Sequence, residues 1–336
     1  MTPGMLLSGL DFVKCLDSDV VLKILSCLDD PADLVRASLV SHAWRDFVIA
    51  NDLSKQLCVK WFPQLSNVVY VTDPTSKFSS SIEVEIRLRD HKVYAYLLHA
   101  LTKLNPAPIE CIKEAFSASS TDRYPAESIV HTLDPVVRGV PFWSYWSSKG
   151  RNDPSIPETL IYKLKSNFCV ISEIGVEPFE ASYQTGRPIY SARSVKFRMG
   201  HPKSKMEVKS SLSILLQEPA DDEFIWTYTS PEFPMAQETR MQHFKLPEPV
   251  LCIGGYVLIE LLGRVQTQAS DGLYYICISH VKVLGRPLSP AFDVEVIEPS
   301  SSGKFVLQYF PDALQERRLQ FHEIQSPFSD EQYGFD

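Results

Sequence analysis

The sequence predicts a two-part α+β protein, in which a small helical N-terminal part and a helical linker precede an antiparallel β-sandwich. Apolar residues follow a helical spacing from about residue 16 to 117. From about 118 to 310 they alternate with polar residues, and Gly and Pro separate the alternating segments. A chain of 336 residues has room for about two domains. Because these strands follow one another without intervening helices, they fit an antiparallel sandwich better than a parallel α/β fold.

Three short helices are expected near the N-terminus. Pro31 suits the first turn of the second helix with Asp30 as its N-cap, and Ser41 can cap the third. The first helix, over 18–27, has Asp17 or Ser18 as its cap. Its apolar residues are spaced by four and form one stripe: Leu16, Val20, Ile24 and Leu28. Helices this short bury little surface alone, so a partner or the following segment must cover them.

The linker and the second part are predicted from the same patterns. A longer helix over 84–104 ends at Asn105 and Pro106, and one more short helix is expected over 108–116. The segment 235–243 is expected to be a long loop, and the polar residues 325–336 a loose tail. Strands are expected over 159–164, 169–178, 194–199, 211–216, 224–229, 241–246, 256–262 and 274–284.

Composition and charge exclude several classes of protein. Hydrophobic residues make up 44% of the chain, which is typical of a folded protein. The formal net charge of −8 argues against a protein whose main work is coating nucleic acid or an anionic membrane. The longest apolar run, 250–259, is too short to span a bilayer, and residues 1–10 do not form a secretory signal. We therefore expect neither a nucleic-acid partner nor a membrane.

The cysteines indicate a reducing compartment. There are seven, none forms a C-x-x-C motif, and most lie in apolar segments. The chain also has no N-x-Ser/Thr sequon. We therefore expect buried free thiols rather than disulfides or zinc, and an intracellular protein of the nucleus, the cytoplasm or both.

Residues 16–62 resemble an F-box. The family pattern has an Ile-Leu-x-x-Leu helix, an Asp-Leu helix and then Val-Ser-x-x-Trp-Arg. The chain has matching residues at 24–28, 33–34 and 40–45, in the same order and spacing. Asp17 stands where the family usually has proline. On this resemblance we assign 11–62 to the F-box, 63–117 to a helical linker, 118–310 to the sandwich and 311–336 to a C-terminal tail.

The resemblance implies docking on a Skp1-type adaptor and, through it, on a cullin–RING ubiquitin ligase. Exposed apolar patches mark partner surfaces, and a short helical unit with surplus apolar positions should present one. Each residue carried over from the family pattern can equally belong to the local core. The adaptor-facing or supporting candidates are Leu16, Ile24, Leu28, Leu34, Val40 and Trp44.

The second part resembles a discoidin-type, galactose-binding-like jelly roll. The resemblance rests on residues 118–122, 145–150 and 157–164 at its opening, and on 256–263 and 274–285 as its last paired strands. An F-box followed by this sandwich is similar to a group of plant F-box proteins. The resemblance implies a binding module whose ligands meet loops at one end, without identifying the ligand.

Two segments of the second part are candidates for ligand contact. Trp143 and Tyr145 belong to an aromatic cluster that could stack on sugars or grip a peptide, or be sandwich core. The segment 193–209 is the most basic stretch, with Arg198, His201 and Lys203. It could receive an acidic or phosphorylated segment, or be an ordinary solvated strand face.

The sequence favours a non-catalytic receptor over an enzyme. It holds no GxSxG, HExxH, P-loop or GxGxxG motif, and no histidine pair at helical spacing. We therefore predict no catalytic residue, no metal and no cofactor. The first hypothesis is a substrate-receptor subunit of an SCF-type (Skp1–cullin–F-box) ligase whose sandwich binds a protein target. The alternative is a lectin-like reader of glycans on glycoproteins.

Overall fold

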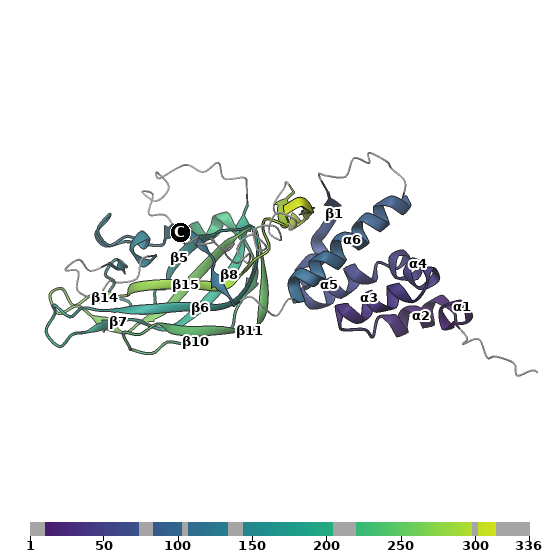
Figure 1. The fold of residues 1–336 in the computed structure, drawn as a ribbon. Coiled ribbons are helices and arrows are strands. Elements are labelled where there is room, and N and C mark those ends of the chain that lie inside the picture. Colours follow the sequence, from purple (N-terminus) through teal and green to yellow (C-terminus); the bar gives the residue numbers. More distant parts are fainter. Residues whose placement is uncertain are drawn as a thin grey trace, which may run out of the picture.

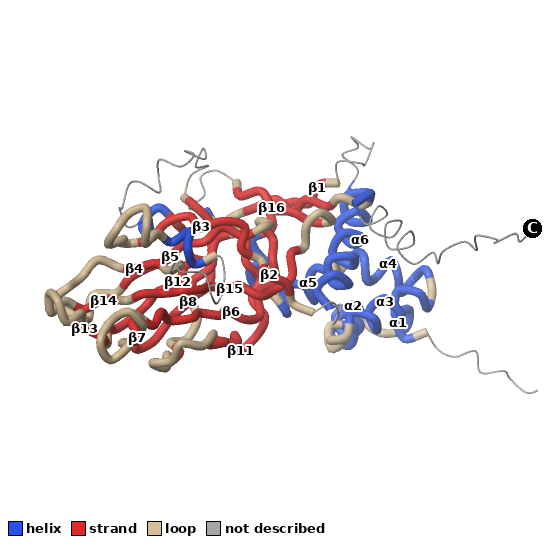
Figure 2. The backbone as a smooth tube through the Cα atoms, turned by 60° about the vertical axis from the view of Figure 1, so that its left-hand side comes forward, coloured by secondary structure: helices blue, strands red, loops and turns tan. Residues whose placement is uncertain are grey.

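The computed structural model of the chain describes residues 11–73, 83–102, 107–133, 144–203, 220–297 and 302–313. A helical part lies at one side and a β-sandwich at the other (Figure 1). In the view of Figure 2, β1 (Val68–Thr72) and β16 (Phe292–Val296) lie between the longest helix and the sandwich. The described part of the chain therefore has three parts: helices, a small sheet and a sandwich.

The helical part begins with the predicted capped helices. The Asp30 side chain accepts a hydrogen bond from the Ala32 amide at 2.8 Å, and the Ser41 hydroxyl accepts one from the Trp44 amide at 3.3 Å. Asp17 occupies the N-cap of α2 without such a bond. Two caps therefore fix where α3 and α4 begin. The helices are α1 (Phe12–Cys15), α2 (Ser18–Leu25), α3 (Pro31–Val40), α4 (His42–Ala50), α5 (Leu53–Trp61), the 3₁₀ turn η1 (Pro63–Asn67) and α6 (Glu83–Thr102).

The second part is the predicted antiparallel sandwich. Within the described residues, one six-stranded sheet has the order β10-β8-β12-β5-β3 with β9 beside β8. The other has the order β11-β6-β15-β2, with β4 beside β15 and β7 beside β6. Alternate side chains of both sheets, such as Val257 and Ile259 from one and Ile174 and Val176 from the other, form a shared core.

The elements of this sandwich follow the predicted strands closely, apart from the strand expected at 211–216, which lies outside the described residues. Their bounds are β2 (Ile109–Glu110), β3 (Ile112–Ala118), η2 (Ile129–Thr132), β4 (Trp146–Ser147), β5 (Glu158–Leu164), β6 (Phe168–Glu180), β7 (Ile189–Tyr190), β8 (Ala192–Pro202), η3 (Ala220–Glu223), β9 (Phe224–Thr229), β10 (Phe233–Pro234), β11 (Gln242–Ile253), β12 (Tyr256–Arg264), β13 (Gln266–Thr267), β14 (Tyr274–Tyr275) and β15 (Cys277–Pro287).

The helix predicted over 108–116 is wrong. These residues form β2, which pairs with β15, and most of β3, which pairs with β5. Apolar residues three and four apart suit a helix, but in a segment this short they also suit a bulged strand. Register shifts along β3 show such irregular pairing. The linker assigned to 63–117 is therefore helical only in part, and its end belongs to the sandwich.

A small third sheet joins the strand that follows the first helices to the last two strands of the described chain. Its order is β1-β17-β16, and β1 pairs in parallel with β17 (Phe305–Tyr309). β16 and β17 fall in the segment 118–310 assigned to the sandwich, but they pair with β1 instead. Phe292 and Leu307 of these strands share one apolar core with Leu97 of α6 and with Phe168 and Leu251 of the sandwich. The helices, the small sheet and the near end of the sandwich are therefore packed on one another.

Truncating Leu307 should loosen the helical part although the residue lies far from it in sequence. Its side chain is fully buried in the shared core. We expect Leu307→Ala to lower the free energy of unfolding by about 2–5 kcal/mol, as in other buried large-to-small changes. Chemical denaturation followed by circular dichroism at helical wavelengths measures this. The neighbouring change Gln308→Ala, at a half-buried side chain, is the control, and an equal loss in both variants would contradict the role of the shared core.

Candidate functional site

An exposed apolar surface covers α2 and α3. Leu39 exposes 78% and Val40 60% of their surface, and the remaining members are between two-fifths and half exposed. Single exposed apolar residues are ordinary, but five on α2 and α3, with Leu16 just before α2, are typical of a partner surface. We call this the α2–α3 apolar surface, and it consists of Leu16, Val20, Ile24, Val35, Leu39 and Val40.

The structure divides the residues that resemble the F-box pattern into two groups. Leu16, Ile24 and Val40 lie on the α2–α3 apolar surface. Leu34 is buried, and Leu28 is half-buried against the helical core. The second group therefore supports the helices instead of offering a free surface.

Trp44 also belongs to the supporting group. Its indole N–H donates to Asp11 Oδ1 at 2.8 Å, and its ring meets the Phe12 ring edge-on at 4.6 Å between centroids. These contacts tie α4 to the chain ahead of α2 and satisfy the indole donor.

Val20, Val35 and Leu39 were missed as surface candidates. Val20 was visible in the stripe spaced by four, whereas Val35 and Leu39 fall outside the family motif. Their signal is that α3 carries apolar residues on both of its faces: Leu34 and Ala37 are buried while Val35 and Leu39 are exposed.

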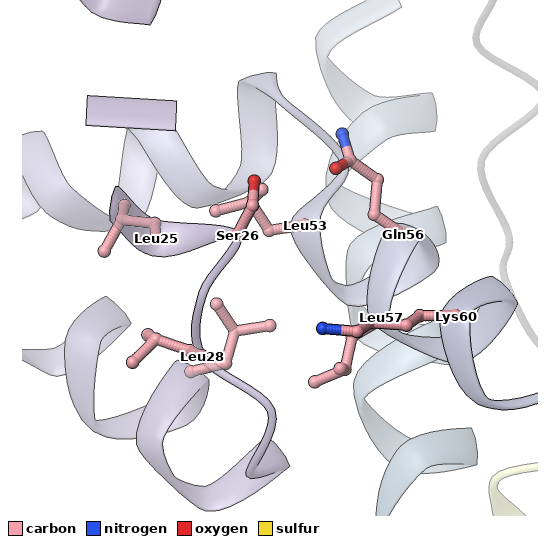
Figure 3. Close-up of a pocket in the computed structure, with 8 residues that line it drawn as sticks. Leu25, Ser26, Leu28, Leu53, Gln56, Leu57 and Lys60 are labelled. Atoms are coloured by element: carbon pink, nitrogen blue, oxygen red, sulfur yellow. The ribbon is translucent and has the colours of Figure 1, made fainter. Parts of the chain in front are cut away.

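A pocket of about 230 Å³ opens between α2, α3 and α5. In Figure 3 the labelled leucines lie around it together with Ser26 and Gln56, and the Lys60 nitrogen points toward the same space. Lys60 also forms an ion pair with Asp29. The apolar lining consists of Leu25, Leu28, Leu34, Leu53 and Leu57. Leu28, the last residue of the stripe that starts at Leu16, therefore lines a pocket that an apolar side chain can fill.

The three basic candidates on the sandwich lie in different surroundings. Arg198 Nη2 donates to Glu260 Oε2 at 3.0 Å on the neighbouring strand, and His201 is buried. Lys203 is exposed. The remaining lysines of that stretch, Lys205 and Lys209, lie outside the described residues. Within the described part, the guanidinium is thus engaged by a carboxylate and the imidazole is covered.

Tyr145 lies at the opposite end of the sandwich, where β6 ends and β7 begins. Its ring stacks on Phe179 at 3.9 Å between centroids, and its hydroxyl donates to Glu127 Oε1 at 2.8 Å. The Tyr183 hydroxyl lies 3.5 Å from that of Tyr145. Burial raises the pKa of the Tyr145 phenol, with the bonds to Tyr183 and Glu127 adding to the effect. Trp143 lies outside the described residues. Of the two predicted aromatic candidates, the described residues therefore include Tyr145, which contacts Phe179 of β6 and Tyr183 of the following turn.

A buried ion pair supports this end of the sandwich. Arg264 and Glu158 are in contact, with side chains 0% and 2% exposed. Arg264 Nη1 also donates to Ser148 Oγ at 2.8 Å, and Glu158 Oε2 accepts from Ser120 Oγ at 2.8 Å and from Ser119. The pair ties the segments around 119, 148 and 264 together. Buried charges need such complete pairing, so its role is positional.

Within the described ranges, no cluster of histidine, cysteine or acidic side chains has the arrangement of a metal site. In the same ranges, none of the helices has the length and apolar character needed to cross a bilayer. All seven cysteines are free thiols, five of them buried.

Comparison with protein families defines the class of the helical part. The F-box-like family model matches residues 18–60, which run from the start of α2 nearly to the end of α5. The α2–α3 apolar surface and its pocket lie mostly within this match. The chain thus carries an F-box-like domain joined to a β-sandwich.

Its family is shown by a relative along most of the chain. F-box protein At4g00755 from Arabidopsis thaliana is 49% identical over 313 residues, which cover 89% of this chain and 82% of that protein. The chain belongs to the F-box protein family of this plant relative.

Solved structures similar to the chain include carbohydrate-binding modules of family 32. The module of Streptococcus pneumoniae EndoD has a TM-score of 0.34 at 11% identity, over 53% of this chain and 98% of that one. The module of Clostridium perfringens NanJ, solved with galactose, has a TM-score of 0.31 at 15% identity, over 52% of this chain and 99% of that one. The sandwich architecture itself rests on the strand order given above.

Proposed function

We propose that this chain is a non-catalytic substrate-receptor subunit of an SCF-type ubiquitin ligase. Its F-box would dock on a Skp1-type adaptor and, through it, on a cullin, while its sandwich would hold a protein target. The observation that carries the proposal is the α2–α3 apolar surface within the F-box-like match.

Burying this surface would drive adaptor docking. Apolar area removed from water contributes about 25 cal/mol per Å², so several half-exposed aliphatic side chains together supply a substantial free energy. The nearby pocket between α2, α3 and α5 adds shape, since an apolar side chain of the adaptor could enter it.

The shared core would hold the target at a defined distance from the ligase. Phe168 and Leu251 of the sandwich pack in the same core as the helices and the small sheet. A ligase subunit accelerates ubiquitin transfer by proximity, and a stiff connection keeps the effective concentration of the target lysine high. The role also requires an intracellular location, in the nucleus, the cytoplasm or both, in keeping with the free thiols.

The experiment uses the full chain and a purified plant Skp1-type protein. We expect a one-to-one complex by size-exclusion chromatography with light scattering, with micromolar or tighter affinity by calorimetry. Adding the N-terminal domain of a cullin should give a ternary complex only when the adaptor is present. A folded chain that forms no complex with any Skp1-type protein of the same plant would contradict the proposal.

A further inference from the structure

A carboxylate is buried among aromatic rings at the end of the sandwich away from the helices, where β7 lies in Figure 1. We call it the Glu127 cluster, and it consists of Glu127, Tyr145, Phe179 and Tyr183. Glu127 precedes η2, Tyr145 precedes β4, and the other two lie at and just after the end of β6. The cluster thus joins three separate segments of the chain.

Glu127 has an unused hydrogen-bond acceptor. The residue is 7% exposed, and its Oε1 accepts the Tyr145 hydroxyl. Its Oε2 is buried and has no hydrogen-bond partner among the residues that the structure describes. Leaving a charged oxygen buried without a donor costs free energy, and most buried polar groups in folded proteins are paired. An unpaired oxygen of this kind is suited to a donor that arrives from a ligand.

The charges around the cluster favour a cationic donor. Burial raises the pKa of the Cys277 thiol to about 12; the hydrogen bond with Ser147 and the charge of Arg264 lower it, and the charges of Glu127 and Asp122 raise it. Asp271 is close by and accepts the Tyr275 hydroxyl at 2.8 Å. Glu127, Asp122 and Asp271 therefore lie near Cys277 and Tyr275, together with the paired Arg264.

Nearby guanidinium groups are already engaged. Arg264 is committed to Glu158 and to the acceptors around it, and Arg187 Nε lies 2.8 Å from Glu180 Oε1. Arg123 lies 3.8 Å from Asp122 and is mostly exposed. These arginines pair with carboxylates other than Glu127.

The aromatic rings suit a cation better than a sugar. A sugar ring packs on a broad aromatic face that is open to solvent. Here Phe179 covers one face of Tyr145 and is itself 4% exposed, whereas Tyr183 is 57% exposed. The negative faces of tyrosine rings attract ammonium and guanidinium groups.

We propose that the Glu127 cluster binds a basic side chain, lysine or arginine, of the target protein. The charged head donates to Glu127 Oε2, and the aliphatic stem lies against Tyr183. Tyr183 is 57% exposed in the turn after β6, so its ring is accessible to such a stem from the solvent side. This inference rests on the proposed function, since it gives the chemistry of the target that the sandwich receives.

The test uses the full chain in complex with its Skp1-type adaptor. The probes are four small molecules: blocked pentapeptides with one central arginine, lysine or glutamate between glycines, and methyl β-galactoside. Ligand-observed NMR measures binding of each. We expect the two cationic peptides to bind at least tenfold more tightly than the glutamate peptide and the galactoside. Equal binding of all peptides, or no binding of the cationic ones, would overturn the proposal.

Two variants locate the binding. Glu127→Gln keeps the shape and the bond from Tyr145 but removes the charge, and we expect cationic-peptide affinity to fall at least tenfold. Tyr183→Ala should weaken it about fivefold. The matched control is Glu238→Gln, at an exposed ion pair with Arg240, which should change nothing. Unchanged affinity in folded Glu127→Gln would overturn the inference.

The remaining outcomes separate the possible causes of failure. Galactoside binding that is lost in Glu127→Gln would assign the cluster to a glycan and overturn the proposal of a basic side chain. An adaptor complex that forms normally without cationic-peptide binding would refute this inference alone. A chain that fails to bind the adaptor would instead contradict the proposed function, whatever the peptides do.

Discussion

Replacing Ile24 and Val40 by aspartate should abolish binding to the Skp1-type adaptor and leave the chain folded. Both side chains lie on the α2–α3 apolar surface, and Val40 is 60% exposed. In the free chain the new carboxylates would stay in water, so they cost little. In the complex each would be desolvated in an apolar interface without a partner, which costs several kcal/mol. Calorimetry with the purified adaptor should show a loss of at least a hundredfold in affinity.

The matched control makes the same chemical change on another helix. Val84 of α6 is 72% exposed and lies outside the F-box-like match. Val84→Asp should bind the adaptor like the parent chain. Retained binding in the folded double variant, or an equal loss in Val84→Asp, would show that the adaptor docks elsewhere. Leu28 is less suitable for this test, because it lines the pocket and packs on the core.

Glu158→Gln should strongly destabilise the sandwich. The change leaves the fully buried Arg264 guanidinium with a neutral amide in place of its counter-charge. Breaking one partner of a buried pair typically lowers the free energy of unfolding by about 3–5 kcal/mol. Denaturant unfolding followed by tryptophan fluorescence measures the loss, since Trp146 is buried in the core of the sandwich.

An exposed pair supplies the comparison. Glu114 and Lys163 lie 3.7 Å apart with the glutamate half exposed, and Glu114→Gln should cost less than about 1 kcal/mol. The double variant Glu158→Gln with Arg264→Met should lose less stability than the sum of the two single changes, because the charges act as a unit. Additive losses, or similar losses at Glu158 and Glu114, would show that the buried pair does not hold this end of the sandwich.

Features set by neighbouring residues could be predicted from the sequence. Asp30 before Pro31, and Ser41 before the third helix, identify where α3 and α4 begin because a cap bonds to an amide two or three residues away. The alternating strands of the sandwich were visible for the same reason: one face of each strand packs in the core.

Features set by distant residues could not be predicted. The segment 108–116 forms strands because it pairs with β5 and β15. These backbone hydrogen bonds stabilise the extended conformation more than the local apolar spacing stabilises a helix. The partner of β1 begins at Phe305, and nothing in residues 68–72 shows that pairing. The ion pair of Arg198, a candidate for anion binding, with Glu260 on the neighbouring strand also depends on residues far apart in sequence.

The candidate sites show the same division. Leu16 and Ile24 belong to a local stripe and Val40 to the family pattern, so three of the six residues of the α2–α3 apolar surface could be named in advance. The Glu127 cluster is assembled from three segments, and only Tyr145 could be singled out from its aromatic neighbours. Glu127 and Tyr183 could not be identified from the sequence, because they contact Tyr145 only in the folded chain.

The pairing of β1 with β17 also has a consequence for synthesis of the protein on the ribosome. Thr72 leaves the ribosome long before Phe305 does. At about 5–20 residues per second the interval is on the order of 10–50 s. During that time the nascent helices lack the strands β16 and β17 that complete their core. The apolar side chains of that core are then exposed and can bind chaperones. A truncated mRNA that ends within β16 or β17 would thus give a chain with an incomplete helical core, although α1 to α6 had already been translated.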